Sequence, residues 1–138
     1  MKEALKPGIK YEHQFVVTDA KTVPGLYPES PDFLAMPHVF ATGYMVGFLE
    51  WACIMAIKPY LDWPYEQSVG THIDVSHEAA TPPGLRVTAR VELIEVDGRK
   101  LRFRVEANDG IDTISKGFHE RMLINKLKFD ERVQKKIS

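Results

Sequence analysis

The sequence predicts a single α+β domain in which an antiparallel sheet curves around one long helix. Three observations support this prediction. Residues 40–56 are almost entirely apolar over a length typical of a helix, the segments after them alternate between polar and apolar residues, and short turn sequences join those segments. A length of 138 residues suits one domain with one core, so residues 1–138 are expected to form one unit.

The central helix is predicted from the stretch FATGYMVGFLEWACIMA, residues 40–56. Apolar residues recur there at the i, i+3, i+4, i+7 spacing of one helix face: Met45, Phe48, Leu49, Ala52, Met55 and Ala56. The other sides of the stretch are apolar as well, which predicts a helix that is buried on all sides. Pro59 ends its regular part.

Five strands are expected around this helix. The first covers residues 11–17, YEHQFVV, which are rich in β-branched and aromatic residues. The others follow the helix at residues 68–80, 85–95, 100–107 and 111–125, where apolar and polar residues alternate. The sequences TPPG, VDGR and NDG between them are turn signals. Tight turns join antiparallel neighbours, so the sheet is expected to be antiparallel.

An apolar helix needs cover on all sides, and a curved antiparallel sheet can supply it. This is the hotdog arrangement, with five strands wrapped around one central helix. The edge strands of such a sheet present unpaired backbone groups, and pairing with a second copy covers them. A homodimer is therefore expected.

Two segments lie outside this plan. Residues 24–38, PGLYPESPDFLAMPH, contain four prolines and are expected to form a loop with short helical turns at most. Their apolar side chains suit a flap over a pocket, or else a satellite core under a long loop. Residues 127–138 are expected to form a polar C-terminal helix or tail. The basic residues of this tail are expected to be a solvated face, with contact to a ligand's phosphates as the alternative.

Composition argues against several classes of function. The formal net charge of −1 gives no electrostatic basis for binding nucleic acid or an anionic membrane. Cys53 is the single cysteine, so no internal disulfide can form and a cytoplasmic location is expected. The N-terminus lacks the apolar core of a signal peptide. The apolar helix is interrupted by Glu50 and is too short to span a bilayer.

Glu50 is the one acid in the apolar helix. Burial of an unpaired carboxylate is costly, so this side chain pairs with an arginine, reaches solvent or has a function. A poorly solvated carboxylate beside Leu49 and Trp51 suits a general base or a nucleophile. Glu50 is therefore the first candidate catalytic residue.

Thr42 and His77 are the second and third candidates. Thr42 opens the helix, where its hydroxyl can act as an N-cap and where free backbone N–H groups can polarise a carbonyl. His77 shares by alternation the face of Ile73 and Val75, either as a satisfied core residue or as a partner of Glu50 or Thr42.

Thr42 and Glu50 are eight residues apart, which is roughly 12 Å along a helix and too far for a direct bond. A site that uses both needs a substrate between them, two subunits, or a non-helical start at Thr42. A site at the dimer interface is favoured.

No metal site and no separate cofactor are expected. His72, Asp74 and His77 lie close in sequence, but alternation places His72 and Asp74 on one face of a strand and His77 on the other. Cys53 is expected to be a structural thiol, because buried thiols are usually inert.

Four long stretches of the sequence resemble one known family. They are KTVPGLYPESPDF, VFATGYMVGFLEWAC, GTHIDVSHEAATPPGL and FHERMLI. In this order they are similar to the fluoroacetyl-CoA thioesterase family, a branch of the hotdog thioesterases, and the resemblance covers residues 7–130. It implies the hotdog fold, a homodimer, and hydrolysis of a short-chain acyl-CoA thioester to the acid and free coenzyme A. Coenzyme A is then part of the substrate and no cofactor is implied.

The resemblance also implies roles for individual residues. The family's catalytic set matches Thr42, Glu50 and His77, and its glycine and arginine near the acyl group match Gly70 and Arg121.

The acyl pocket is expected to include Phe33 and Met36 of the 24–38 segment. The family enzyme that selects fluoroacetyl groups has a phenylalanine lid at the position of Met36. Methionine is flexible and does not form a rigid aromatic gate, so selectivity for the fluorinated group is not implied.

Two other functions remain open. A hydratase acting on an enoyl-CoA needs an acid and a histidine placed to add water, and Asp74 and His77 face opposite ways on the predicted strand. A non-catalytic acyl-CoA-binding module needs a pocket but no acid, whereas Thr42, Glu50 and His77 are all present.

Overall fold

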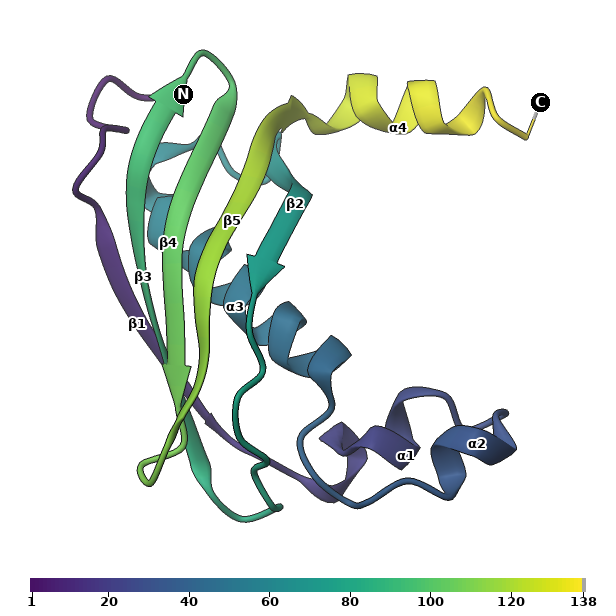
Figure 1. Ribbon diagram of the computed structural model, residues 1–138. Helices are drawn as coiled ribbons and strands as arrows, with labels where there is room; N and C mark the ends of the chain where they lie inside the picture. Colours follow the sequence, from purple (N-terminus) through teal and green to yellow (C-terminus); the bar gives the residue numbers. More distant parts are fainter. Residues whose placement is uncertain (138) are drawn as a thin grey trace.

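The computed structural model describes residues 1–137 and contains a five-stranded antiparallel sheet with a long helix on one face (Figure 1). The strands lie in the order β1-β3-β4-β5-β2. Their bounds are β1 Lys10–Val16, β2 Glu66–Val75, β3 Arg86–Asp97, β4 Lys100–Asn108 and β5 Thr113–Asn125. The helices are α1 Val23–Leu26, α2 Pro31–Leu34, the long α3 Thr42–Ile57 and α4 Lys126–Gln134, with short 3-10 turns at Asp19–Lys21 and Lys58–Tyr60. The predicted antiparallel sheet and central helix are confirmed, with bounds shifted by a few residues.

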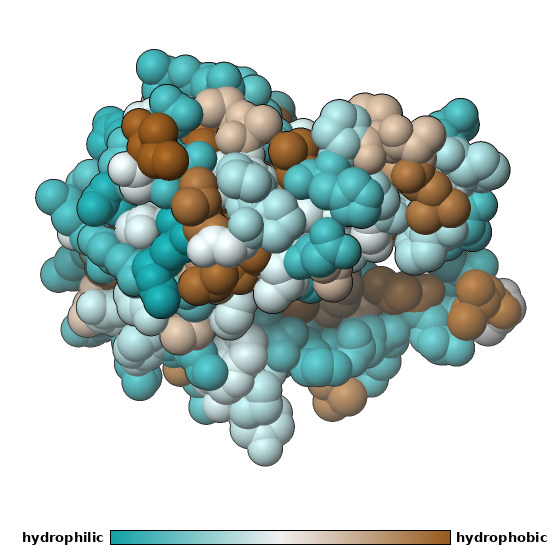
Figure 2. Space-filling model, turned by 90° about the horizontal axis from the view of Figure 1, so that it is seen from below, coloured by the Kyte–Doolittle hydropathy of each residue, from teal (hydrophilic) through white to brown (hydrophobic). Residues whose placement is uncertain are grey.

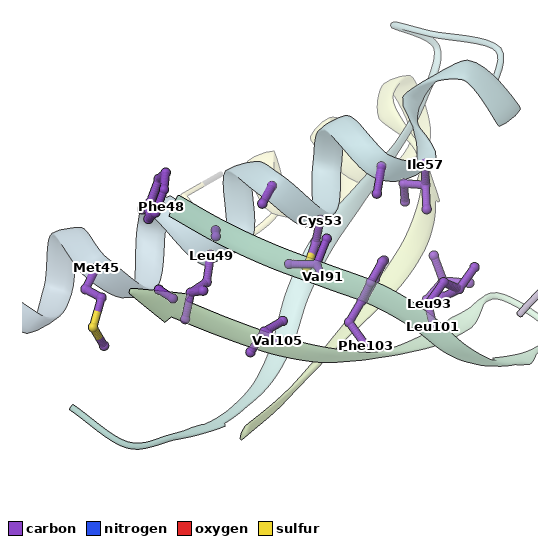
Figure 3. Close-up of a cluster of buried hydrophobic side chains, with 14 of the residues drawn as sticks. Met45, Phe48, Leu49, Cys53, Ile57, Val91, Leu93, Leu101, Phe103 and Val105 are labelled. Atoms are coloured by element: carbon purple, nitrogen blue, oxygen red, sulfur yellow. The ribbon is translucent and has the colours of Figure 1, made fainter. Parts of the chain in front are cut away.

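The core lies between α3 and the sheet. Figure 3 shows side chains of α3 packed against side chains of β3 and β4, namely Met45, Phe48, Leu49, Cys53 and Ile57 with Val91, Leu93, Leu101, Phe103 and Val105. Along β4 the buried residues alternate with more exposed, mostly charged ones, as a sheet with one covered face requires. Burial of each large apolar side chain contributes about 1.5–3 kcal/mol, so this layer fixes α3 on the sheet.

One side of α3 is not covered by its own chain. Trp51 is 49% exposed, and Gly43 and Gly47, which precede it at intervals of four residues, are exposed as well. Residues spaced by four lie on one helix face, so a stripe of α3 is left partly open, with the Trp51 ring resting on that of His13 of β1 at 4.1 Å. The prediction that the helix is buried on all sides is therefore wrong for a single chain, because one sheet covers only the side on which it packs.

Strand β2 is an edge strand with a β-bulge. Its pairing with β5 shifts between Gly70 and His72, so Thr71 is the extra residue. The bulge reverses the alternation, and Gly70 therefore shares the helix-facing side with Ile73. The uniform alternation predicted for residues 68–80 is wrong, and the strand ends at Val75. Within residues 1–137, β2 pairs with β5 alone and its other edge is free.

The chain stays extended after β2 and leads back to the start of α3. The backbone N–H of Ser76 donates to the carbonyl of Lys116 at 3.0 Å, and that of Glu78 donates to the carbonyl of Ile114 at 2.7 Å. Gly117 permits this close approach: a Cβ there would lie 2.0 Å from the carbonyl oxygen of Asp74, at a φ of +154°. The extended segment positions His77 beside α3.

The two segments outside the sheet have distinct structures. Between α1 and α2, the rings of Tyr27 and Phe33 stack at 5.2 Å, while Met36 is 48% exposed. Helix α4 is capped by the side chain of Asn125, which accepts a hydrogen bond from the N–H of Lys128 at 3.1 Å. Figure 1 shows α4 extending away from the sheet, past the edge formed by β2. No helix within residues 1–137 is both long and apolar enough to cross a membrane.

Candidate active site

Glu50 lies in the middle of α3, and its carboxylate is held by Arg121 of β5. Oε2 of Glu50 accepts a hydrogen bond from Nη1 of Arg121 at 2.7 Å. The Arg121 side chain is 3% exposed, whereas that of Glu50 is 36% exposed. The carboxylate is therefore paired on one side and open on the other. Of the alternatives that the sequence left open, the structure combines pairing with an arginine and access to solvent.

Arg121 makes three further hydrogen bonds that fix its orientation. Nε donates to Oγ of Ser68 at 2.7 Å, and Nη2 donates to the carbonyl oxygen of Ser68 at 2.9 Å. Nη1 also lies 3.1 Å from Nε2 of His119. A planar guanidinium held at these points presents its charge to Glu50 in one fixed position.

His119 is buried between Arg121 and β2. Its Nδ1 lies 2.7 Å from the carbonyl oxygen of His72, which can only accept, so Nδ1 carries the proton and Nε2 accepts from Arg121. Burial lowers the pKa of His119, and the charge of Arg121 acts in the same direction. His119 is therefore neutral at neutral pH and adds no second positive charge beside Glu50.

Gly70 supplies the space in which the carboxylate lies. A Cβ at this position would be 2.6 Å from Oε2 of Glu50, closer than van der Waals contact allows. The structure thus brings together three of the predicted site residues, Glu50, Gly70 and Arg121, on α3, β2 and β5.

A cavity of about 410 Å³ opens at this carboxylate. It is lined by Val46, Glu50, Gly70, Thr71, His72, Ile73 and His119. This volume is typical of a small-molecule site, and the lining combines apolar surface with one carboxylate. A larger cavity, of about 720 Å³, lies over the face of the sheet away from α3 and contains none of the predicted residues.

Thr42 and His77 form a second pair. Thr42 is the first residue of α3, after the N-cap residue Ala41, so a capping role for its side chain is wrong. Its Oγ1 lies instead 2.7 Å from Nδ1 of His77. Burial lowers the pKa of His77, so the neutral ring can accept the hydroxyl proton at neutral pH. Nε2 of His77 is buried and has no hydrogen-bond partner within residues 1–137.

The two groups lie apart in a single chain. Thr42 and Glu50 both belong to α3, which keeps them roughly 12 Å apart along the axis and excludes a non-helical start at Thr42. The cavity at Glu50 is lined by neither Thr42 nor His77. Phe33 and Met36 also lie outside its lining, so the predicted flap does not cover this cavity within one chain.

Ser68 and His119 are site residues that the sequence analysis does not identify. His119 precedes Arg121 by two positions on β5, and alternation places both on one face, so a signal for it was present. Ser68 carried no such signal. It shares the helix-facing side with Ile73 only because of the bulge at Thr71, which the sequence pattern does not reveal.

Cys53 is buried in the layer between α3 and the sheet. Burial raises the pKa of its thiol well above the usual range. A protonated, enclosed thiol is a poor nucleophile, which agrees with the structural role expected for Cys53.

His119 is expected to make the free energy of unfolding depend on pH. Its pKa is lower in the folded chain than in the unfolded chain, where it is about 6.5. Below that value the unfolded chain takes up the proton first, so the free energy of unfolding falls as the pH is lowered from 7 towards 5. His119→Gln is expected to reduce this fall, by up to about 1 kcal/mol per pH unit, in urea unfolding at a series of pH values. The same slope in both proteins would contradict the assignment of a buried neutral His119.

Comparisons with known proteins agree with this architecture. The family model described as fluoroacetyl-CoA-specific thioesterase matches residues 17–127. The fluoroacetyl-CoA thioesterase of Streptantibioticus cattleyicolor is 54% identical over 136 residues, which cover 99% of this chain and 97% of the relative.

Solved structures extend the comparison. One of fluoroacetyl-CoA thioesterase matches with a TM-score of 0.94 at 53% identity and covers 97% of this chain and 98% of that chain. A thioesterase superfamily member from Thermus thermophilus matches with a TM-score of 0.83 at 27% identity, covering 96% of this chain and 93% of that chain.

The fold and these relatives define the class of the protein, which is a hotdog-fold thioesterase. The fold and the enzyme class predicted from the sequence are confirmed. More narrowly, the chain belongs to the fluoroacetyl-CoA-specific thioesterase family, since the family model covers most of it and a relative is 54% identical along almost its whole length.

Proposed function

We propose that the chain hydrolyses short-chain acyl-CoA thioesters to the acid and free coenzyme A, with Glu50 as the central catalytic residue. The proposal is carried by the Glu50 carboxylate, held by buried Arg121 and open to a cavity of about 410 Å³. Such a carboxylate can attack the thioester carbonyl, forming a mixed anhydride as the thiolate leaves, or can take a proton from an attacking water. Relatives named as thioesterases support this reaction class.

The carbonyl oxygen gains negative charge in either route and needs hydrogen-bond donors. The described residues offer backbone N–H groups near Gly70, where β2 is bulged, and unpaired N–H groups in the first turn of α3. A donor of this kind typically contributes about 3 kcal/mol to the transition state. Arg121 positions Glu50, and the neutral His77 accepts or returns a proton through Thr42.

A homodimer completes the site in this proposal. Thr42 and His77 of one copy face Glu50 of the other, which removes the problem of their separation along α3. The free edge of β2 supports an interface there, because the chain itself leaves this edge uncovered and the cavity at Glu50 lies beside it. Figure 2, seen from below, shows a recess between the near segment with α1 and α2 and the distant α4, and hydrophobic residues form its floor.

Subunit complementation is expected to demonstrate the shared site. Glu50→Gln and His77→Ala are each expected to be inactive, but a doubly tagged heterodimer of the two keeps one complete site and recovers about half of the wild-type activity. The measurement is thiol release by the heterodimer purified through both tags. Two differently tagged Glu50→Gln copies serve as the control and are expected to remain inactive. An inactive mixed heterodimer would place all three residues in one chain.

Release of free thiol from a panel of short acyl-CoA thioesters is the direct test of the function. The panel covers acetyl, fluoroacetyl, short branched and aryl groups, and turnover of at least one of them is expected. An enoyl-CoA is assayed beside this panel. Loss of its conjugated double bond without release of free thiol would indicate a hydratase. Tight binding of acyl-CoA with no turnover of any member would indicate a binding module.

Selectivity for the fluorinated acyl group is expected to respond to residue 36. Met36 is unbranched and flexible, so it does not form a rigid gate over the acyl group. Met36→Phe is expected to raise the ratio of kcat/KM for fluoroacetyl-CoA over acetyl-CoA several-fold. Leu34→Phe, at a similarly exposed position of α2, is the matched control. An equal ratio in wild type and Met36→Phe would remove residue 36 from selectivity.

The cytoplasm is the proposed location of this reaction. The single cysteine, Cys53, is free and buried, which suits a reducing compartment. The acyl-CoA substrate and a second copy of the chain are the partners in this proposal.

A further inference from the structure

A cavity of about 300 Å³ lies between the turn that joins β3 to β4 and the helix α4. It is lined by Arg99, Asn125, Lys128, Glu131, Arg132 and Lys135. Four of these residues are cations and one is an acid, so the lining has a formal excess of three positive charges. The whole chain carries a formal charge of −1, and the cavity is therefore a local concentration of positive charge.

The cations come from two elements and converge on one place. Lys128 and Arg132 are four residues apart on one face of α4, and Lys135, the C-cap residue, follows Arg132 by three residues and lines the same cavity. Arg99 approaches from the turn between β3 and β4. The carbonyl of Arg99 accepts a hydrogen bond from the N–H of Leu123 at 2.8 Å, which fixes the position of this turn.

These charges are not balanced within the chain. Among residues 1–137, no ion pair involves any of the four cations, whereas Lys126 on the other side of α4 pairs with Asp130. Like charges three and four residues apart destabilise a helix. Glu131 offsets one of the four charges, and a bound anion would relieve the repulsion that remains.

We infer that this basic cavity binds the phosphate groups at the nucleotide end of the acyl-CoA substrate. The inference rests on the proposed function, which supplies a ligand with several phosphates. Strand β5 connects the two places, since Arg121 contacts Glu50 and Asn125 lines the basic cavity. Four strand residues span about 13 Å, a distance that the extended pantetheine arm of coenzyme A can bridge.

The test compares two thioesters with the same acyl group, one on coenzyme A and one on N-acetylcysteamine, which carries no phosphate. The double variant Lys128→Gln/Arg132→Gln is expected to raise KM for the acyl-CoA about tenfold. The ratio of kcat/KM for the acyl-CoA over the truncated thioester is expected to fall by a similar factor. The control Lys116→Gln/Lys126→Gln removes the same charge away from the cavity and is expected to keep the wild-type ratio.

Ionic strength provides a second readout. Added KCl is expected to raise KM for the acyl-CoA more in wild type than in Lys128→Gln/Arg132→Gln, because salt screens the charges that the variant lacks. An unchanged KM for the acyl-CoA, or an equal loss on both thioesters, would overturn the inference.

The proposed function and this inference can fail separately. If the wild type hydrolyses neither thioester, the proposed function fails. Calorimetric titration with coenzyme A then tests the cavity alone, with about tenfold weaker binding to the double variant than to the wild type expected. Equal affinity for both proteins would overturn the inference.

Discussion

Glu50→Gln is expected to lower kcat for acyl-CoA hydrolysis by about a thousandfold, the scale of a lost acid–base or nucleophilic group. The amide has the shape of the carboxylate, and its oxygen can still accept the hydrogen bond from Arg121. It can neither attack a thioester nor take a proton from water. The variant is expected to fold, with a free energy of unfolding lower by about 1–2 kcal/mol, because Glu50 is 36% exposed and water compensates in part for the lost charge.

The matched control for this change is Glu92→Gln. Glu92 pairs with Arg104 at 3.4 Å on strands β3 and β4, away from the cavity at Glu50. This variant loses the same charge and is expected to keep the wild-type kcat. Single-turnover thiol release measures the chemical step in all three proteins. Turnover of Glu50→Gln at the wild-type rate would remove Glu50 from the mechanism.

Arg121→Met is expected to lower the free energy of unfolding by about 3 kcal/mol, because it removes the four hydrogen bonds of a buried side chain, at about 1 kcal/mol each with less for the partly exposed Glu50. The methionine fills most of the volume but leaves several acceptors without a donor: the Glu50 carboxylate, the Ser68 carbonyl and Nε2 of His119. The carboxylate also loses the group that fixes its position, so kcat is expected to fall together with stability.

Urea unfolding and thiol release of two further variants give the comparison. Arg121→Lys keeps the charge but reaches fewer of the partners, so an intermediate stability is expected. Arg104→Met removes the exposed pair with Glu92 and is expected to cost less than about 1 kcal/mol. If Arg121→Met and Arg104→Met had the same free energy of unfolding, the four hydrogen bonds of Arg121 would contribute no more to stability than one exposed ion pair.

Most of the fold could be predicted because its signals are local. Apolar spacing identified α3, and the alternation along β4 identified a strand with one buried face. The bulge at Thr71 could not be predicted, because one extra residue changes the alternation without changing composition. The exposed stripe of α3 was also missed. Apolar sequence alone does not distinguish a helix side that its own sheet covers from a side that is left exposed.

The candidate site was predictable to a lesser extent. Glu50 was identified from burial logic alone, since an acid in an apolar helix requires a partner or a function. Its partner Arg121 came only from the family resemblance, because the contact joins residues 71 positions apart in the chain. His119 illustrates a different failure. Alternation along β5 places His119 on the same face as Arg121. Its role, however, depends on a hydrogen bond to the backbone carbonyl of His72, and every residue type carries such a carbonyl, so the sequence gives no signal for this contact.

The enclosed sulfur of Cys53 has a practical consequence for kinetics. Released coenzyme A can be counted with an aromatic disulfide dye while the native enzyme is present, since the only protein sulfhydryl is buried and stays protonated. The colour that develops in the first turnover then reports product rather than labelled protein. The enzyme can therefore be used at the concentrations that a pre-steady-state burst requires, without mutating its cysteine.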